Sequence, residues 1–170
     1  MKFFENRRGK LVLEALAIIV VVVVVQLWQS RGLPEGPAPA LAGVGLDGKP
    51  LDLAAVVRGV NGKPTLVVFW ATWCPVCKAE DGNIQSISAD YPVLSVAMQS
   101  ENVAKHLQER GLTFATIDDR DAALSTAWKV RGVPAHFIVD GTGNVRFRVV
   151  GYATTWGLRA RLWWTEQFPP

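Results

Sequence analysis

The sequence is poor in the side chains that hold metal ions or haem, with two cysteines and two histidines in 170 residues. A structural zinc site needs about four ligands, so it would have to combine both cysteines with His106 and His136. We interpret His106, in a polar helical stretch, as a solvated surface group, and His136, in an apolar run, as a packed strand residue. Covalent haem attachment requires a histidine directly after the second cysteine. Lys78 stands there, which excludes it.

The sequence also lacks a basic patch with interleaved aromatic residues, the pattern typical of nucleic-acid-binding surfaces. The formal net charge is +3, but residues 1–30 carry four basic and two acidic groups, whereas residues 31–170 carry 14 and 13. The basic pI therefore reflects the N-terminal segment, and we expect no nucleic-acid partner. No internal repeat occurs either.

One long apolar run is present, from Leu11 to Trp28, interrupted by only two polar residues. As a helix it spans about 27 Å, close to the thickness of a bilayer's hydrocarbon core of about 30 Å. Four basic residues precede the run and only Arg31 follows closely, which predicts a cytoplasmic N-terminus. We therefore expect a short cytoplasmic segment at residues 1–10, a transmembrane anchor at residues 11–28, and the remaining chain on the far side of the membrane.

A cleaved secretory signal is the alternative interpretation of this run. The small-x-small sequence Ala40-Leu41-Ala42 lies far past the run, and the run is longer than a usual signal core, so we favour an uncleaved anchor. Residues 29–42 are rich in Pro, Gly and Ala, which predicts an extended linker. Residues 43–170 remain for one folded domain.

Within this domain, apolar runs with strand character alternate with helical segments. The turn residues 47–50 predict a small hairpin, and the helix that follows Pro75 is expected to be interrupted or bent near Gly82. The predicted strands are 65–70, 93–98, 113–117, 135–139 and 145–150, and the predicted helices are 54–60, 75–90, 102–110, 122–129 and 155–168. This order predicts a three-layer α/β domain.

The chemistry of the chain concentrates at the end of one predicted strand. Thr65 to Trp70 is an unbroken run of β-branched, aromatic and aliphatic residues, typical of a strand covered on both faces. Cys74 and Cys77 follow, where a helix is expected to begin. At this spacing the pair can close a small disulfide, and the first thiol can lie at the positive end of the helix. A purely structural disulfide would enclose only two residues and stabilise the fold little.

The stretch Trp73-Cys74-Pro75-Val76-Cys77-Lys78 resembles the active site of thioredoxin-like proteins. Val130-Arg131-Gly132-Val133-Pro134 is similar to the segment in which that family places a cis-proline opposite the cysteines. With the anchor, the linker and the hairpin, residues 43 to 168 look closest to the membrane-anchored TlpA/ResA/DsbE group, and within it to ScsD-type protein disulfide oxidoreductases. The resemblance implies a central mixed sheet flanked by helices, with an N-terminal β-hairpin extension.

The resemblance also implies roles for individual residues. Cys74 would attack the substrate's disulfide, and Cys77 would resolve the mixed disulfide. A cis bond would join Val133 to Pro134. The residues expected to contact the substrate are Trp73, Pro75, Val76, Val133 and Pro134.

One departure from the family pattern concerns the proton of Cys77. Thioredoxin has a buried aspartate where this chain has Val68, which cannot accept a proton. Our hypothesis is that Glu80, three residues after Cys77, tunes the thiol pKa values or shuttles the proton of Cys77. The alternative is a solvated glutamate on the helix surface. The group often has a proline soon after this glutamate, whereas Asp81-Gly82-Asn83 stands here.

These observations predict a thiol–disulfide oxidoreductase at the bacterial inner membrane, with its catalytic domain in the periplasm and no cofactor. Its partners would be exported proteins and a membrane redox protein that resets the cysteine pair. By resemblance we favour a reductant, in cytochrome maturation or metal-stress repair. A copper-handling protein that uses the same two thiolates is the alternative, because soft thiolates select Cu(I).

Overall fold

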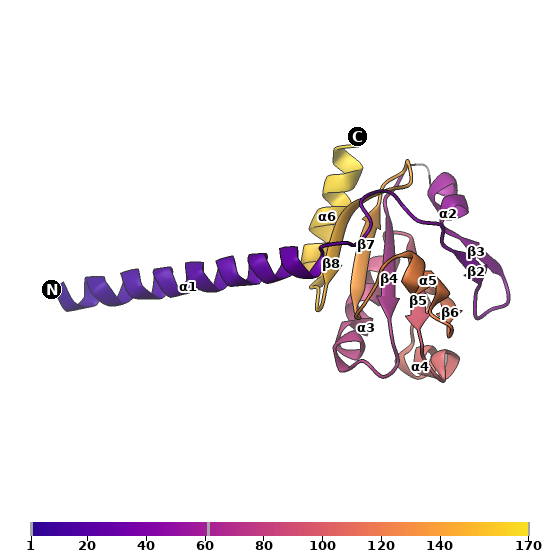
Figure 1. Cartoon of the computed structure of the whole chain (residues 1–170), viewed down its shortest axis with the longest axis horizontal. Helices are drawn as coiled ribbons and strands as arrows, with labels where there is room; N and C mark the ends of the chain where they lie inside the picture. Colours follow the sequence, from indigo (N-terminus) through magenta and orange to yellow (C-terminus); the bar gives the residue numbers. More distant parts are fainter. Residues whose placement is uncertain (1, 61, 170) are drawn as a thin grey trace. The chain divides into compact units, whose positions relative to one another are not determined.

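The structure is a computed structural model that describes residues 2–60 and 62–169, apart from the side chains of residues 2–8, 19, 22, 23 and 26–29. The chain divides into two compact units, with the boundary between Arg31 and Gly32. The first unit contains the helix α1, Lys2–Gln29 (Figure 1). Among the described residues, no helix is long and apolar enough to cross a membrane. The predicted anchor, 11–28, includes several of the side chains that lie outside the described set.

The second unit is built on a mixed six-stranded sheet with the order β1-β8-β7-β4-β5-β6 (Figure 1). The central strand β4 pairs in parallel with β5 and antiparallel with β7. A separate hairpin joins β2 and β3. The strands are β1 Gly36–Pro37, β2 Ala42–Val44, β3 Pro50–Asp52, β4 Thr65–Trp70, β5 Val93–Met98, β6 Ala115–Asp119, β7 Ala135–Val139 and β8 Asn144–Val150. The helices are α2 Leu53–Gly59, α3 Pro75–Ser88, α4 Val103–Arg110, α5 Ala123–Ala127 and α6 Thr155–Gln167.

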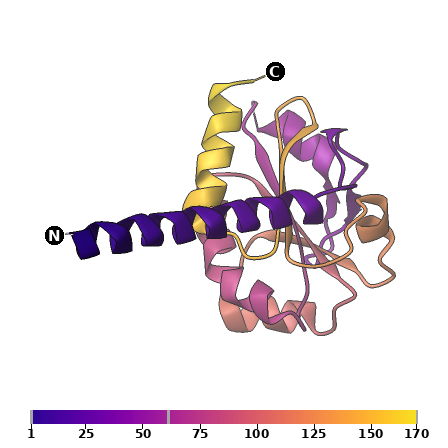
Figure 2. The same ribbon diagram turned by 60° about the vertical axis from the view of Figure 1, so that its left-hand side comes forward.

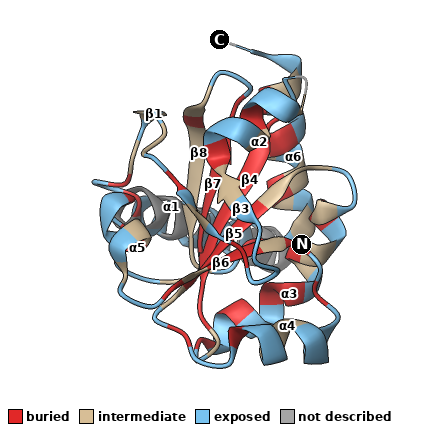
Figure 3. Cartoon of the chain, turned by 90° about the vertical axis from the view of Figure 1, so that its right-hand side faces the viewer, coloured by how far each residue is buried: buried red, intermediate tan, exposed pale blue. Residues whose placement is uncertain are grey.

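Two hydrophobic cores lie on opposite faces of this sheet, because successive side chains of a strand point to opposite faces. Leu66 and Val68 of β4 belong to the core that α3 and α6 cover, whereas Val67 and Phe69 belong to the core on the other face, with residues of α2. Figure 2 shows α3 and α6 on one side of the sheet and α2 and α5 on the other. In Figure 3 the central strands are almost entirely buried and the helices expose their outer surfaces. The predicted three-layer domain is confirmed.

The N-terminal boundary of this domain differs from the prediction. The compact unit begins at Gly32, within the segment that we expected to be a linker. Leu33 and Leu41 are buried in the core, and β1 pairs with β8. The composition of the segment, rich in Pro, Gly and Ala, is typical of a linker. Burial of its two leucines nevertheless stabilises its packing against the domain.

The other element predictions agree closely with the structure. β5 and β7 have the predicted bounds, and β2 and β3 form the predicted hairpin. The helix was expected to be interrupted or bent near Gly82, and an interruption is excluded because α3 runs through that residue as one continuous helix. Gly82 is exposed there, and a glycine costs an exposed helix interior only about 1 kcal/mol.

Candidate active site

Cys74 lies in the connection between β4 and α3, directly before the first residue of the helix. All six residues of β4 are buried, and Cys74 is the N-cap of α3, with extended backbone angles. The Cys77 backbone N–H donates a hydrogen bond to Cys74 Sγ at 3.2 Å, so the sulfur takes the place of the usual capping oxygen. Pro75 occupies the first turn of the helix, where its missing N–H costs nothing. The first thiol therefore lies at the positive end of the helix dipole, as predicted.

Cys77 lies one turn inside α3 and is almost completely buried. Burial raises the pKa of the Cys77 thiol well above its ordinary value, and the hydrogen bond with Cys74 and the negative charges of Cys74 and Glu80 raise it further. The thiol is therefore held in its protonated form. Any reaction in which Cys77 acts as a nucleophile needs a group that takes its proton.

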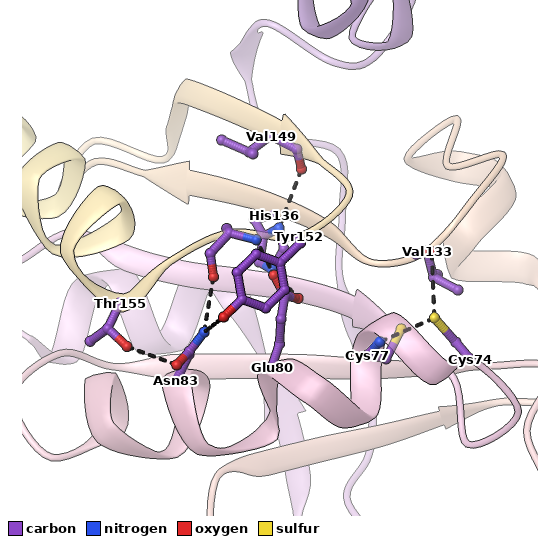
Figure 4. A network of polar contacts seen from close by, with 10 residues as sticks. Cys74, Cys77, Glu80, Asn83, Val133, His136, Val149, Tyr152 and Thr155 are labelled. Atoms are coloured by element: carbon purple, nitrogen blue, oxygen red, sulfur yellow. Dashed lines mark hydrogen bonds and ion pairs between the residues drawn. The ribbon is translucent and has the colours of Figure 1, made fainter. Parts of the chain in front are cut away.

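The segment before β7 faces the cysteine pair, as the resemblance implies. The peptide bond between Val133 and Pro134 is cis. The carbonyl oxygen of Val133 accepts a hydrogen bond from Cys74 Sγ at 3.6 Å (Figure 4). Cys74 therefore lies between the first turn of α3 and the cis-proline segment.

The surface around Cys74 is apolar and exposed, although Cys74 itself is only 4% exposed. Trp73 and Val76 are exposed large hydrophobic residues, and Pro75 is exposed as well. The Trp73 indole N–H donates to the carbonyl oxygen of Gln99, which fixes the ring beside the cysteine. A cleft of about 510 Å³ lies next to Trp73 and is also lined by Thr72, Lys78, Gln99, Lys105 and Glu109.

Glu80 is buried and paired, so the interpretation as a solvated surface glutamate is wrong. Its side chain is 2% exposed, and its Oε2 lies 3.1 Å from Nε2 of His136. Its Oε1 accepts a hydrogen bond from the backbone N–H of Ala153. Figure 4 shows the Glu80 side chain extending from α3 towards His136.

His136 is a fully buried strand residue, as predicted. It belongs to β7, and its Nδ1 lies 3.3 Å from the carbonyl oxygen of Val149 on β8. The sequence did not reveal that it pairs with Glu80, 56 residues away in the chain. The only available signal was the position of His136 two residues after Pro134.

Asn83 is a further residue of the site that the sequence analysis did not assign. Its side-chain NH₂ donates to the Tyr152 hydroxyl and to the Ala153 carbonyl, and its amide oxygen accepts from the Thr155 hydroxyl (Figure 4). Asn83 lies three residues after Glu80, on the same side of α3. These bonds hold the segment after β8 against α3, where Ala153 contacts Glu80.

His106 is the histidine for which the prediction was wrong. Its side chain is 12% exposed, and its Nε2 lies 3.0 Å from Asp81 Oδ2. The ring also packs against Trp70, with 5.2 Å between the ring centroids. His106 lies on the side of α4 that packs towards α3, where Asp81 is its partner. Among the described residues, no group of three or more His, Cys, Asp or Glu is placed to hold a metal ion.

Comparison with known proteins identifies the family of this chain. Residues 34–148 match the AhpC/TSA family. The chain belongs to this family. The thiol:disulfide interchange protein DsbE of Escherichia coli K12 is 30% identical over 179 residues, which cover 95% of this chain and 94% of the relative. The thiol:disulfide interchange protein HelX of Rhodobacter capsulatus is 32% identical over 124 residues, which cover 71% of this chain and 68% of HelX.

A solved structure of a similar protein has the same fold. A thiol:disulfide interchange protein of the thioredoxin family from Chlorobium tepidum superposes with a TM-score of 0.66 and 26% identity, over 78% of this chain and 97% of that protein. The predicted thioredoxin-like fold and DsbE-like relationship are therefore confirmed. The curated relatives are, by name, thiol–disulfide oxidoreductases.

Proposed function

We propose that this chain exchanges disulfides with exported proteins through Cys74 and Cys77. The observation that carries the proposal is the arrangement of the two sulfurs, with Cys74 at the N-cap of α3 against the Val133 carbonyl and Cys77 buried one turn behind it. Two thiols in this position can form a disulfide with each other and with a substrate in turn.

In the reducing direction the exchange takes two steps. The Cys74 thiolate attacks one sulfur of the substrate disulfide, and the other substrate sulfur leaves as a thiolate and takes a proton. Cys77 then loses its proton and attacks Cys74 Sγ, which forms the Cys74–Cys77 disulfide and releases the second substrate thiol. Two electrons pass from the protein to the substrate, so a redox partner must reduce the pair before the next cycle.

The proposed substrate is a polypeptide that lies across the cis-proline segment. Its backbone would run beside Val133 and Pro134, and its side chains would contact Trp73, Pro75 and Val76. The exposed apolar surface of Trp73 and Val76 beside the recessed Cys74 supports this placement, because it offers an extended chain side chains to pack against.

Glu80 is the proposed acceptor of the Cys77 proton. Cys77 and Glu80 lie three residues apart on α3, where side chains are neighbours, and both side chains are buried. Removal of one acceptor in acid–base catalysis typically costs about 10²–10⁴ in rate.

Attachment to the membrane is part of the proposal. The apolar run from Leu11 to Trp28 and the basic residues before it support an anchor with the domain in the periplasm. Continuous helix from Lys2 to Gln29 is consistent with this assignment. Extraction of bacterial membranes with sodium carbonate tests it. The full chain should stay in the pellet and a chain beginning at Gly32 should be released; release of the full chain contradicts anchoring but not disulfide exchange.

We further propose that the chain acts as a reductant, as in cytochrome maturation, and that its likeness to ScsD-type proteins reflects a similar role. The reduction potential against glutathione tests the direction. A value near the reducing end of the range for related dithiols, roughly −270 to −120 mV, supports a reductant, whereas a value near −120 mV contradicts it.

Trapping tests the exchange itself. The Cys77→Ala chain should accumulate mixed disulfides between Cys74 and periplasmic proteins, while the Cys74→Ala chain should form none. The wild-type chain should also catalyse reduction of insulin by dithiothreitol. Tight stoichiometric binding of Cu(I) without reductase activity would favour the copper-handling alternative and contradict the proposal.

A further inference from the structure

His136 and Glu80 form a buried hydrogen-bonded pair, and the proposed exchange reaction gives the histidine no chemical role. Both side chains are buried, at 0% and 2% exposure. Their position is fixed from two sides, because Ala153 N–H donates to the carboxylate and Val149 O lies against the ring. Burial of ionisable groups destabilises the fold unless their charges are paired and hydrogen-bonded.

The hydrogen-bond partners fix how many protons the pair holds. A carbonyl oxygen can only accept, so Nδ1 of His136 carries a hydrogen and donates it to Val149 O at 3.3 Å. Nε2 faces Glu80 Oε2 at 3.1 Å, and a hydrogen bond there requires one hydrogen between the two atoms. That hydrogen lies either on Nε2, which gives an imidazolium and a carboxylate, or on Oε2, which gives two neutral groups. In both arrangements the pair is neutral overall and can take up one more proton.

We propose that this neutral pair takes up the Cys77 proton during the resolving step, with His136 as the positioning residue that keeps Glu80 able to accept it. This rests on the proposed function. The thiol proton moves to a Glu80 oxygen, and both groups of the pair are then protonated. The positive charge of the pair offsets the negative charge of the Cys77 thiolate. After the Cys74–Cys77 disulfide forms, the pair gives the proton to the departing substrate thiolate, so no proton or electron is left over.

Without His136, the same carboxylate would be a buried charge with no cationic partner. Such a group takes a proton from solvent instead of remaining charged, and it then has no capacity to accept one from Cys77. The other ionisable groups on the packed elements do not replace the histidine. Arg146 and Arg148 of β8 pair with Asp140 and Glu35. Arg159 of α6 pairs with Asp90, and Lys78 of α3 is exposed.

The test follows the full reduced chain as it reacts with dithiobis(nitrobenzoate). Attack by Cys74 releases one coloured thiolate, and resolution by Cys77 releases a second, so one stopped-flow trace reports both steps. In His136→Gln, which keeps a neutral hydrogen-bond donor, the second phase should slow by roughly tenfold or more, while the first phase changes less than about threefold. The second phase of the variant should also accelerate with buffer-base concentration, because solvent bases replace the pair, whereas the wild-type phase should not.

His106→Gln is the matched control, because it removes the other histidine that is bonded to a carboxylate of α3. It should leave both phases within about threefold of wild type. Glu80→Gln should slow the second phase as His136→Gln does, and the double variant should match Glu80→Gln alone, because the two residues act as one unit. A wild-type second phase in His136→Gln, or losses that multiply in the double variant, would overturn the proposal.

Should His136→Gln fail to fold, ring-nitrogen NMR of the reduced wild type decides, because the proposal requires hydrogen on Nδ1. A bare Nδ1 overturns it, and a protonated Nδ1 supports it. If the wild type shows no second phase, the proposed function itself fails. If the wild type resolves normally and His136→Gln does too, only the role of His136 fails.

Discussion

Val68 and His136 lie directly opposite each other in the register of β4 and β7. Val68 occupies the position at which the thioredoxin resemblance leads one to expect a buried aspartate. Paired residues on neighbouring strands project to the same face of a sheet, so His136 points to the face that α3 covers. The buried acid of this protein therefore comes from the helix, as Glu80, and its partner comes from the neighbouring strand.

Replacement of Glu80 by Gln should lower the pKa of Cys77 and yet slow the resolving step in which Cys77 loses its proton. The negative charge of Glu80 contributes to the raised pKa of Cys77, so Glu80→Gln should lower that pKa, although burial should keep it above the ordinary value. The resolving step should nevertheless slow, because the proton has lost its acceptor. Titration of Cys77 by NMR, together with the second stopped-flow phase, measures both. A lower pKa with faster resolution would show that Glu80 acts only as a charge.

The stability of the reduced protein should fall at alkaline pH because of Cys77. The folded-state pKa of this thiol is raised by burial, so its contribution is fully present below the unfolded-state pKa of about 8.5 and is lost as pH rises towards the folded value. Between these limits the free energy of unfolding should fall by at most about 1.4 kcal/mol per pH unit. Urea unfolding of reduced wild type and Cys77→Ala at several alkaline pH values isolates this slope. Parallel curves for the two proteins would contradict it.

The sequence predicted most of the fold because its local signals agree with its packing. β4 is buried on both faces and its sequence is uniformly apolar, so its strand character is unambiguous. Cys74 could be placed at a helix start because Pro75 follows it, and proline favours the first turn of a helix. The cysteine motif and the cis-proline segment were therefore identified together.

The pairing of buried polar groups could not be predicted in the same way. Glu80 and His136 are 56 residues apart, and they meet because the register of β4 and β7 turns His136 to the face that α3 covers. His106 and Asp81 meet because α4 packs beside α3, and a polar helical stretch gives no indication of that neighbour. Charged side chains are most often exposed to solvent. The rule does not hold for a charged side chain that is buried between two packed secondary-structure elements.

The segment from Gly32 to Ala42 should prove to be part of the folded domain. Leu33 and Leu41 are 8% and 1% exposed, and burial of a leucine side chain contributes about 1.5–3 kcal/mol. A fragment that begins at Gly32 should therefore unfold at clearly higher urea concentration than one that begins at Gly43. The loss should approach a few kcal/mol, since β1 also loses its pairing with β8. Equal urea midpoints for the two fragments would restore the linker interpretation.

Two tryptophans of this chain should differ sharply in their contribution to stability. Trp128 is fully buried and packs edge-on against Phe137 and tilted against Phe69, with ring centroids 4.9 and 5.5 Å away. Trp128→Ala should lower the free energy of unfolding by about 3–5 kcal/mol, because it leaves a cavity among aromatic rings. Trp156 is 84% exposed, and its replacement by Ala should change stability by less than about 0.5 kcal/mol. Denaturant unfolding of both variants measures the difference, and similar losses in the two would contradict the assignment of Trp128 to the core.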